Sequence, residues 1–276
     1  MDFLHDSQLG KASTYSERRD PGLLFPIPRD EGRAALGNDA ARHFVGCDIW
    51  HAWELSWLNE RGRPQVAVAR FTIDCHSPNL IESKSFKLYL NSLAQTRFST
   101  RSELAQVLRE DLGSVAEATF EVEILDPDAK TLVPQPLPGE SLDDIDLVLE
   151  SGDYGPPQAD WLQADTGQTG SEVLTTRLFR SNCPVTGQPD WASVQIAFEG
   201  PRVDRAGLLR YLVSFRNHSG FHEQCVERIF TDLHLMCSPR HLDVRACFTR
   251  RGGLDINPWR STRHPRPATA VRDPRQ

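Results

Sequence analysis

LYLNSL, at residues 88–93, and RYLVSF, at residues 210–215, share a tyrosine, a leucine and a serine at the same spacing, about 122 positions apart. A second pair, LREDL at residues 108–112 and IFTDL at residues 229–233, has an offset of about 121. An offset that stays nearly constant across several elements indicates an internal repeat. The sequence therefore predicts two similar modules in tandem.

The pattern around each copy of the repeat is strand, helix, helix, strand. RPQVAVARFTIDC (63–75) alternates with a period near two, which is typical of a strand. TRSELAQVLREDL (100–112) has a threonine ahead of an apolar stripe, which is typical of a capped amphipathic helix. The other expected elements are a helix in LIESKSFKLYLNSLAQ (80–95), strands in EATFEVEIL (117–125) and WASVQIAFEG (191–200), helices in DRAGLLRYLVSFRNH (204–218) and FHEQCVERIFTDLHLMC (221–237), and a strand in HLDVRACFTRRGG (241–253). Such modules form an α+β fold, in which helices pack on one face of an antiparallel sheet.

Shifts in composition divide the chain into five segments. Stretches rich in Pro, Gly and charge are typical of connectors and ends rather than of packed modules. The expected segments are an N-terminal arm (1–45), a first module (46–126), a connector (127–172), a second module (173–262) and a flexible basic tail (263–276). Within the connector, IDLVLE (145–150) is the candidate edge strand.

Charge and hydropathy exclude several classes of partner. The formal net charge of -7 argues against nonspecific nucleic-acid binding, which depends on clustered Lys and Arg. No apolar run approaches membrane-spanning length, and the first 20 residues lack a secretory pattern, so we expect a cytoplasmic protein. In that compartment the six cysteines are expected to be free thiols. His218, His222 and Cys225 could share a helical face, but they support a zinc site only weakly, and no metal is predicted.

SNCPVTGQPDW (181–191) carries the first candidate for chemistry. Its prolines and glycine place Cys183 in a turn or loop. A thiolate is a strong nucleophile that needs an acid or base nearby, and Asp190 could fold back beside it. A buried, inert cysteine with Asp190 capping a turn is equally compatible with the sequence.

Two further stretches carry charged groups near expected helix starts. In NHSGFHEQ (217–224), His222 could handle protons near neutral pH and Glu223 could accept from paired N–H donors. In ESKSFKLY (82–89), Lys84 and Lys87 could meet phosphates. Taken singly, the first is more simply a helix N-terminus and the second a solvated helix face.

Four motifs together resemble one family. ESKSFKLY, SNCPVTGQPDW, NHSGFHE (217–223) and RRGGLDINPWRS (250–261) look like those of the NADPH-dependent 7-cyano-7-deazaguanine reductases of queuosine biosynthesis, in their long two-module form. The resemblance covers about residues 15 to 262. It implies tandem tunnelling-fold modules, a homodimer, and reduction of a nitrile to a primary amine with two NADPH. The implied partners are a small deazapurine substrate and a second copy of the chain, with no direct nucleic acid and no membrane.

The resemblance also implies roles for single residues. Cys183 resembles the nucleophile that forms a covalent thioimide with the nitrile carbon, and Asp190 resembles the proton donor. Glu82 and Glu223 match the carboxylates that hold the deazaguanine ring, and His222 matches the residue beside the reacting centre. The positions matched to NADPH binding are Ser83, Lys84, Ser85, Lys87, Arg251 and Gly252. Because the motifs fall in both modules, the resemblance implies a site at the interface between them.

Two residues depart from the family pattern, and three other functions stay open. Pro184 stands where an aliphatic residue is expected and Gly187 where a serine is expected, so the loop around Cys183 could differ in stiffness. The alternatives are a zinc-dependent pterin or purine cyclohydrolase of the same fold, a thiol nitrile hydrolase, and an interaction module without catalysis. Stoichiometric zinc would indicate the cyclohydrolase, and ammonia release without NADPH loss would indicate the nitrile hydrolase. A phenotype that is insensitive to Cys183→Ala would indicate the interaction module.

Overall fold

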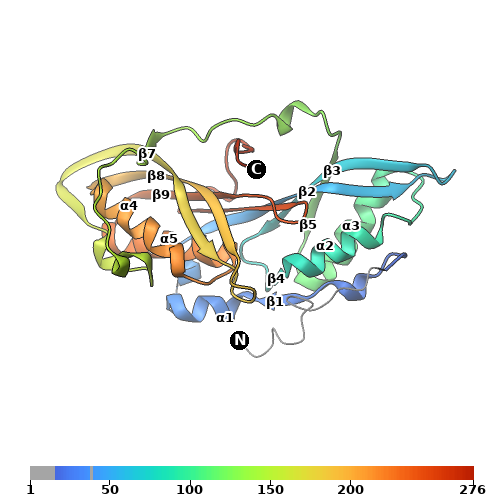
Figure 1. The fold of residues 1–276 in the computed structure, drawn as a ribbon, viewed down its shortest axis with the longest axis horizontal. Helices are drawn as coiled ribbons and strands as arrows, with labels where there is room; N and C mark the ends of the chain where they lie inside the picture. Colours follow the sequence, from blue (N-terminus) through green and yellow to red (C-terminus); the bar gives the residue numbers. More distant parts are fainter. Residues whose placement is uncertain (1–15, 38–39) are drawn as a thin grey trace. The chain divides into compact units, whose positions relative to one another are not determined.

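The computed structural model describes residues 16–37 and 40–276 and divides them into two compact units. The first unit contains residues 16–32, 48–133 and 250–256, and the second contains 33–37, 40–47, 134–249 and 257–276. Figure 1 shows a mixed α/β architecture of long strands and a few helices. Two strands, β2 (Val45–Leu58) and β10 (Leu254–Ser261), contribute residues to both units.

The first unit is built on an antiparallel sheet that is covered by two helices. Its strands follow the order β5-β3-β2, and β3 pairs with β5 from Val68 opposite Leu125 to Ile73 opposite Phe120. Helices α2 and α3 lie on one face of these strands (Figure 1). Besides β2, its elements are η2 (Pro21–Leu23), β1 (Pro26–Pro28), β3 (Pro64–Asp74), β4 (Asn79–Ile81), α2 (Ser83–Ser92), α3 (Arg101–Ala116), β5 (Phe120–Leu125) and η5 (Lys130–Leu132).

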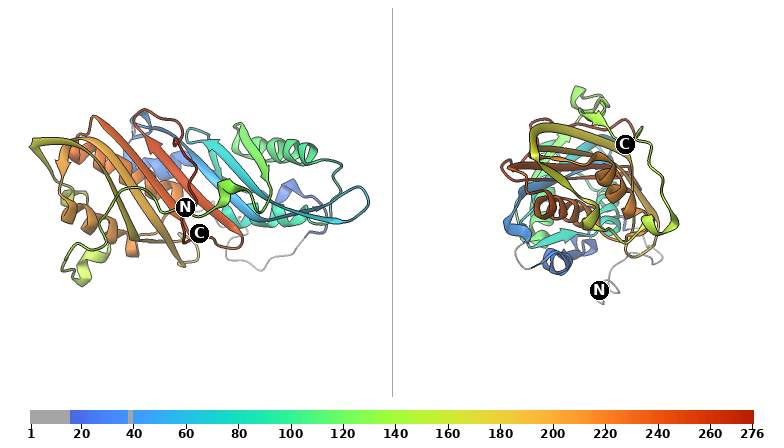
Figure 2. Two further views of the ribbon diagram at one scale, coloured as in Figure 1. Left: turned by 90° about the horizontal axis from the view of Figure 1, so that it is seen from above. Right: turned by 90° about the vertical axis from the view of Figure 1, so that its left-hand side faces the viewer.

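The second unit repeats this arrangement with longer strands. Its order is β10-β9-β8-β7-β6, and β8 pairs antiparallel with both β7 and β9. Figure 2 shows α4 and α5 on the same side of β7, β8 and β9. Besides β10, its elements are η3 (Ala34–Leu36), η4 (Ala40–Arg42), β6 (Glu140–Ser141), η6 (Ser151–Tyr154), η7 (Ala159–Trp161), β7 (Ala164–Asn182), β8 (Pro189–Val203), α4 (Arg205–Ser214), η8 (Phe215–Asn217), α5 (His222–Cys237) and β9 (His241–Phe248). Helix α1 (Arg29–Arg33) joins residues of both units.

Equivalent side-chain hydrogen bonds occur in the two units, at positions that the predicted repeat aligns. In the first unit the Tyr89 hydroxyl donates to Asp111 over 2.6 Å, and in the second the Tyr211 hydroxyl donates to Asp232 over 2.7 Å. Both tyrosines are fully buried. Burial and the neighbouring carboxylate raise the pKa of each phenol above its usual value, so both hydroxyls stay protonated donors. The same bond therefore ties the helix pair together in each unit.

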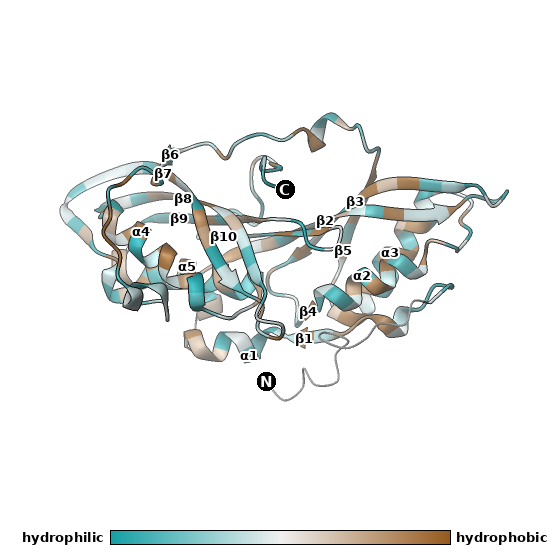
Figure 3. Ribbon diagram, in the orientation of Figure 1, coloured by the Kyte–Doolittle hydropathy of each residue, from teal (hydrophilic) through white to brown (hydrophobic). Residues whose placement is uncertain are grey.

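Apolar periodicity decides which helix face meets the sheet. In Figure 3, hydrophobic and hydrophilic residues alternate around α2 and α3. The buried side of α3 carries Leu104, Leu108 and Leu112, each with no exposed surface. These side chains pack against strand residues such as Phe71, because a helix that buries one stripe needs an apolar face opposite it. The helix begins at the predicted cap, where Thr100 accepts from the Glu103 N–H.

In three stretches outside the modules the structure differs from what the sequence predicts. These are the extended N-terminal arm, the IDLVLE strand of the connector and the flexible basic tail. Residues 16–37 and 40–45 contain short helical turns and a strand, with Ile27 and Phe44 buried. The edge strand of the connector lies at Glu140–Ser141, parallel to β7, and residues 145–150 form neither helix nor strand. In the basic tail, Asp273 and Gln276 are buried because their polar groups are hydrogen-bonded.

Candidate active site

Cys183 lies in the tight turn between β7 and β8. Its backbone N–H donates to the Gln188 carbonyl and its carbonyl accepts from the Gly187 N–H, which closes the turn. Gly187 has φ +66, a left-handed conformation that glycine adopts without steric cost and serine does not. The departure from the family pattern at this position therefore has a conformational reason. Cys183 is half-buried, whereas the other five cysteines are buried.

The hairpin returns the chain so that Asp190 lies opposite Ser181. The register pairs Asn182 with Pro189 and Ser181 with Asp190, directly beside the turn that holds Cys183. Asp190 is only 4% exposed. The seven-residue spacing thus spans the turn and the first two residues of β8, so Asp190 lies at the start of the strand that follows the cysteine turn.

His222 is oriented by an aromatic ring and by Asp190. It is the first residue of α5, and its ring stacks on Phe248 with centroids 3.9 Å apart and planes 24° apart. His222 Nε2 lies 3.5 Å from Asp190 Oδ2. Stacking fixes the plane of the imidazole, and the carboxylate fixes which edge faces the hairpin. A histidine and a carboxylate so placed can pass a proton between them or to a third group.

Backbone bonds hold the α4–α5 loop against the cysteine turn. The Asn182 N–H donates to the His218 carbonyl, and the Gly220 N–H donates to the Asn182 carbonyl. The Asn182 side chain adds a bond to the Arg216 carbonyl over 3.2 Å. These bonds involve the residue immediately before Cys183, so the turn and the start of α5 are mutually fixed.

Two glutamates on α5 occupy successive turns of one helix face. Glu223 is 3% exposed and Glu227 is 2% exposed. Glu227 accepts from both Arg33, at 2.8 Å, and Arg260, at 2.7 Å. This buried arginine–glutamate–arginine cluster anchors the face of α5 that carries Glu223 one turn earlier.

The zinc set considered from the sequence does not assemble. His222 stacks on Phe248 and lies 3.5 Å from Asp190, and Cys225 is buried. Within residues 16–37 and 40–276, ligand atoms of three such side chains converge only at Asp74, Cys75 and His76. That tripeptide lies in the first unit and contains none of the proposed ligands.

His218 should make stability depend on pH. Burial lowers the pKa of His218 below its usual value of 6.5, and the charge of Arg228 lowers it further. The folded state then binds fewer protons than the unfolded chain, so this contribution is complete above 6.5 and is lost as pH falls through the lowered value. We expect the free energy of unfolding in urea to fall between about pH 7 and about pH 5, and to fall less in His218→Gln. Parallel curves for the two proteins would contradict this.

The remaining candidate residues lie in the first unit, around the start of α2. Glu82 caps this helix: its carboxylate accepts from the N–H groups of Lys84 and Ser85, each over 2.7 Å. Burial raises the pKa of Glu82, although those two N–H groups act in the opposite direction. Ser85 is fully buried, and its hydroxyl donates to the Glu82 carbonyl and accepts from the Phe25 N–H. Its hydroxyl is therefore used inside the fold.

Lys87 and the glycine pair before β10 border a small cavity of the first unit. Its volume is about 60 Å³, and its lining includes Glu54, Lys87, Asn91, Gly252 and Gly253. Gly252 has φ +60, and a Cβ added there would lie 2.4 Å from Lys87 Nζ. Glycine thus leaves room for the ammonium group beside the turn. Ser83 and Lys84 are half-buried, and Arg251 is exposed.

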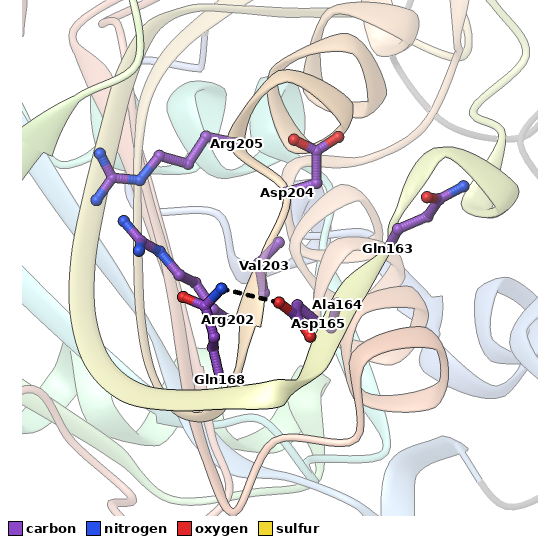
Figure 4. Close-up of a pocket in the computed structure, with 8 residues that line it drawn as sticks. All are labelled: Gln163, Ala164, Asp165, Gln168, Arg202, Val203, Asp204 and Arg205. Atoms are coloured by element: carbon purple, nitrogen blue, oxygen red, sulfur yellow. Dashed lines mark hydrogen bonds between the residues drawn. The ribbon is translucent and has the colours of Figure 1, made fainter.

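A larger hollow lies at the other end of the β7–β8 hairpin. It encloses about 520 Å³, and Figure 4 shows Asp165 and Gln168 joined by a hydrogen bond at its edge. Roughly 60 Å of extended chain separates Asp165 from Cys183. The charges near it are paired, with Arg205 bound to Glu172 and Glu140. The hollow therefore has no part in the thiol site.

Phe248 is the part of the site that the sequence did not single out. It belongs to a predicted strand, and a buried phenylalanine in a strand has no feature that separates a stacking platform from ordinary core. Asn182 likewise has no distinguishing feature in the sequence besides its position next to Cys183. Only the folded register shows that these two residues position His222 and the cysteine turn.

Comparison with known proteins identifies the family. Residues 15–124 match the family model described as "Nitrile reductase, 7-cyano-7-deazaguanine-reductase N-term", and residues 189–267 match "QueF-like protein". A relative from Stenotrophomonas maltophilia (strain K279a), named NADPH-dependent 7-cyano-7-deazaguanine reductase, is 55% identical over 95% of this chain and 94% of its own length. One of the same name from Xanthomonas campestris pv. campestris (strain B100) is 52% identical over the whole of both chains.

A solved structure is also similar, at a much lower level. The archaeosine synthase QueF-Like in its apo form shares 14% identity, with a TM-score of 0.30 over 34% of this chain and 91% of its own. A TM-score this low does not establish a shared fold. The identities with the sequence relatives, which exceed half over nearly full length, carry the assignment. The chain therefore belongs to the family of NADPH-dependent 7-cyano-7-deazaguanine reductases, which are oxidoreductases.

Proposed function

We propose that this protein reduces the nitrile of 7-cyano-7-deazaguanine to the primary amine of 7-aminomethyl-7-deazaguanine, in queuosine biosynthesis, with NADPH as reductant. The observation that carries the proposal is the hairpin that has half-buried Cys183 in its turn and buried Asp190 on the strand that follows, with Asp190 Oδ2 3.5 Å from His222 Nε2. Family membership supplies the reaction. The hairpin supplies a nucleophile and proton-handling groups of the kind that this reaction needs.

The first step joins Cys183 to the substrate. Its Sγ bonds to the nitrile carbon while one carbon–nitrogen π bond breaks, and the electron pair goes to nitrogen. Nitrogen takes a proton from Asp190, and the proton that the thiol gives up restores the acid. The product is a thioimide that carries the whole substrate, and it is a better electrophile than a nitrile. His222 keeps the Asp190 carboxyl oriented during this exchange.

Glu223 and Glu82 are assigned to the deazaguanine ring. A carboxylate accepts from paired N–H donors such as those on a guanine-like edge. Glu223 lies one residue after His222, in the first turn of α5. Glu82 already accepts two backbone N–H bonds, and the remaining lone pairs of its oxygens leave acceptor capacity.

NADPH is assigned to the first unit. Lys87 Nζ lies directly against Gly252 and supplies a cation for a phosphate, and Ser83, Lys84 and Arg251 add donors. Ser85 supports this site by fixing the α2 cap rather than by contact, because it is fully buried. NADPH, when bound, supplies hydride. These basic residues would hold its phosphates and orient it.

We also propose the finer features that the resemblance implies. Each unit is assigned as a tunnelling-fold module, which is supported by the strand–helix–helix–strand order and by the repeated Tyr–Asp bond. A homodimer in the cytoplasm with no direct nucleic-acid contact is the expected working form. Among the helices of residues 16–37 and 40–276, none has the length and hydropathy needed to cross a membrane.

Consumption of NADPH tests the function directly. With 7-cyano-7-deazaguanine, the reduced protein should consume two NADPH per nitrile, since a nitrile takes up two hydrides on its way to an amine. Absorbance gives the NADPH loss and chromatography gives the amine. Ammonia release without NADPH loss would instead identify a nitrile hydrolase and overturn the proposal.

A further inference from the structure

Gln276 is buried against the end of β9. It is 6% exposed, and its Nε2 donates to the Phe248 carbonyl over 2.8 Å and to Asn257 Oδ1 over 2.6 Å. Burying an amide is costly unless its hydrogen bonds are made, and both of these bonds lie within the second unit. The tail that looked solvated in the sequence thus ends in a specific polar contact.

The tail holds this amide in one orientation. Gln276 Oε1 accepts from the Asp273 N–H over 2.9 Å, which identifies Nε2 as the donor to Phe248. The Gln276 N–H donates to the Asp273 carbonyl, and Arg272 donates to the Gln276 backbone oxygen. Further along, Arg245 on β9 donates to the carbonyls of Thr269 and Val271. Residues 269–276 are therefore fastened to β9 at both of their ends.

Phe248 links this contact to the candidate active site. It is the last residue of β9, and strand ends fray unless other bonds hold them. On one side its carbonyl is held by Gln276, and its ring is the surface on which His222 stacks at 3.9 Å. His222 in turn lies 3.5 Å from Asp190. Gln276 is thus two contacts away from the proton-handling pair.

A second tail residue reaches the neighbour of Asp190. The Arg275 guanidinium donates to the Arg177 carbonyl and lies 5.9 Å from the centre of the Trp191 ring. Trp191 follows Asp190 on β8, and its carbonyl accepts from the Thr249 N–H just beyond β9. The tail therefore contacts both strands that carry the platform and the carboxylate.

We propose that Gln276 is a positioning residue for the reaction, acting through Phe248 to hold the His222 ring against Asp190. The expected loss of kcat rests on the proposed function, whereas the expected change in the orientation of the His222 ring does not. Without the Gln276 amide, the Phe248 carbonyl loses this bond, and the peptide that follows Phe248 keeps the bond from the Thr249 N–H to Trp191. The stacked imidazole then samples orientations that face Asp190 less well. Substrate binding, which does not involve Phe248 or Gln276 in this account, is unchanged.

The test compares Gln276→Met with the unaltered protein. Methionine keeps the length and the apolar volume but cannot donate. Misplacing a group of the proton pathway by a fraction of an ångström should lower kcat by about 10- to 100-fold, with KM for the nitrile within about twofold. In NMR spectra of histidine-labelled protein, the His222 ring signals should move, because they report the ring current of Phe248. Those signals also test the geometry if no turnover is found in the unaltered protein.

Thr269→Ala is the matched control, since Thr269 is exposed and contacts Arg245 through its backbone carbonyl alone. It should keep both kcat and the His222 signals. If Gln276→Met does not fold, kcat and the His222 signals are measured in Gln276→Asn, whose side chain is one carbon shorter. Unchanged kcat and unchanged His222 signals in the glutamine variants would overturn the proposal, as would equal losses in Thr269→Ala.

Discussion

Cys183→Ala is expected to lose nitrile reduction by at least about 10⁴-fold while it keeps its affinity for the deazapurine. Removing the nucleophile of a covalent mechanism removes the path itself, and losses of this size are typical of such residues. The turn around Cys183 is closed by backbone bonds that alanine preserves, so the fold should be intact. NADPH oxidation measures the loss, and calorimetry with the nitrile measures the retained binding.

Thr186→Ala supplies the control for this variant. Thr186 belongs to the same turn and is exposed, and the one bond of its side chain, from the Gln188 N–H, is 3.5 Å long. Its turnover should stay within about threefold of the unaltered protein. Substantial reduction by Cys183→Ala would show that the thiol is a bystander and that a different group activates the nitrile.

Glu227→Gln is expected to cause the largest loss of stability. Arg33 and Arg260 both donate to this carboxylate, and Arg260 has no exposed surface. Both guanidinium groups also lie 5.6 Å from the Phe44 ring, which gives them no counter-charge. Neutralising Glu227 removes the carboxylate that both guanidinium groups share, one of them fully buried and the other 11% exposed, so the free energy of unfolding should fall by about 3–5 kcal/mol. Urea unfolding followed by circular dichroism measures it.

Glu199→Gln is the matched surface change for Glu227→Gln. Glu199 lies 3.7 Å from Arg263, and both side chains are substantially exposed at 39% and 50%. Water and salt screen such a pair, so its loss should cost less than about 1 kcal/mol. Equal effects of the two substitutions would mean that the buried cluster is not held together by its charges.

The repeat and the main elements could be predicted because they depend on local pattern. The apolar stripe around Leu108 and the Thr100 cap lie on the sequence itself, and so does the near-constant offset between Tyr89 and Tyr211. The edge strand could not be placed, because strand formation needs a partner. Glu140–Ser141 finds one in β7, while Val148 in the apolar run is 80% exposed.

The candidate site could be predicted as far as residue types indicate the chemistry of their side chains. A cysteine and an aspartate in one turn-rich stretch give a nucleophile and an acid, and four motifs in order identify the family. The residues that position these groups could not be predicted from residue type. Phe248 looks like any core phenylalanine, and Gln276 sits in a stretch whose composition is typical of a solvated tail. Their roles depend on contacts between residues far apart in the sequence.

The measurement that tests the central claim most directly is the intact mass of the protein after mixing with 7-cyano-7-deazaguanine in the absence of NADPH. The account predicts an added mass equal to one whole nitrile molecule, located on the peptide that carries Cys183, lost on adding NADPH, and absent from Cys183→Ala. Reduction of the nitrile by a protein that shows no such adduct, or an adduct that persists in Cys183→Ala, would contradict it.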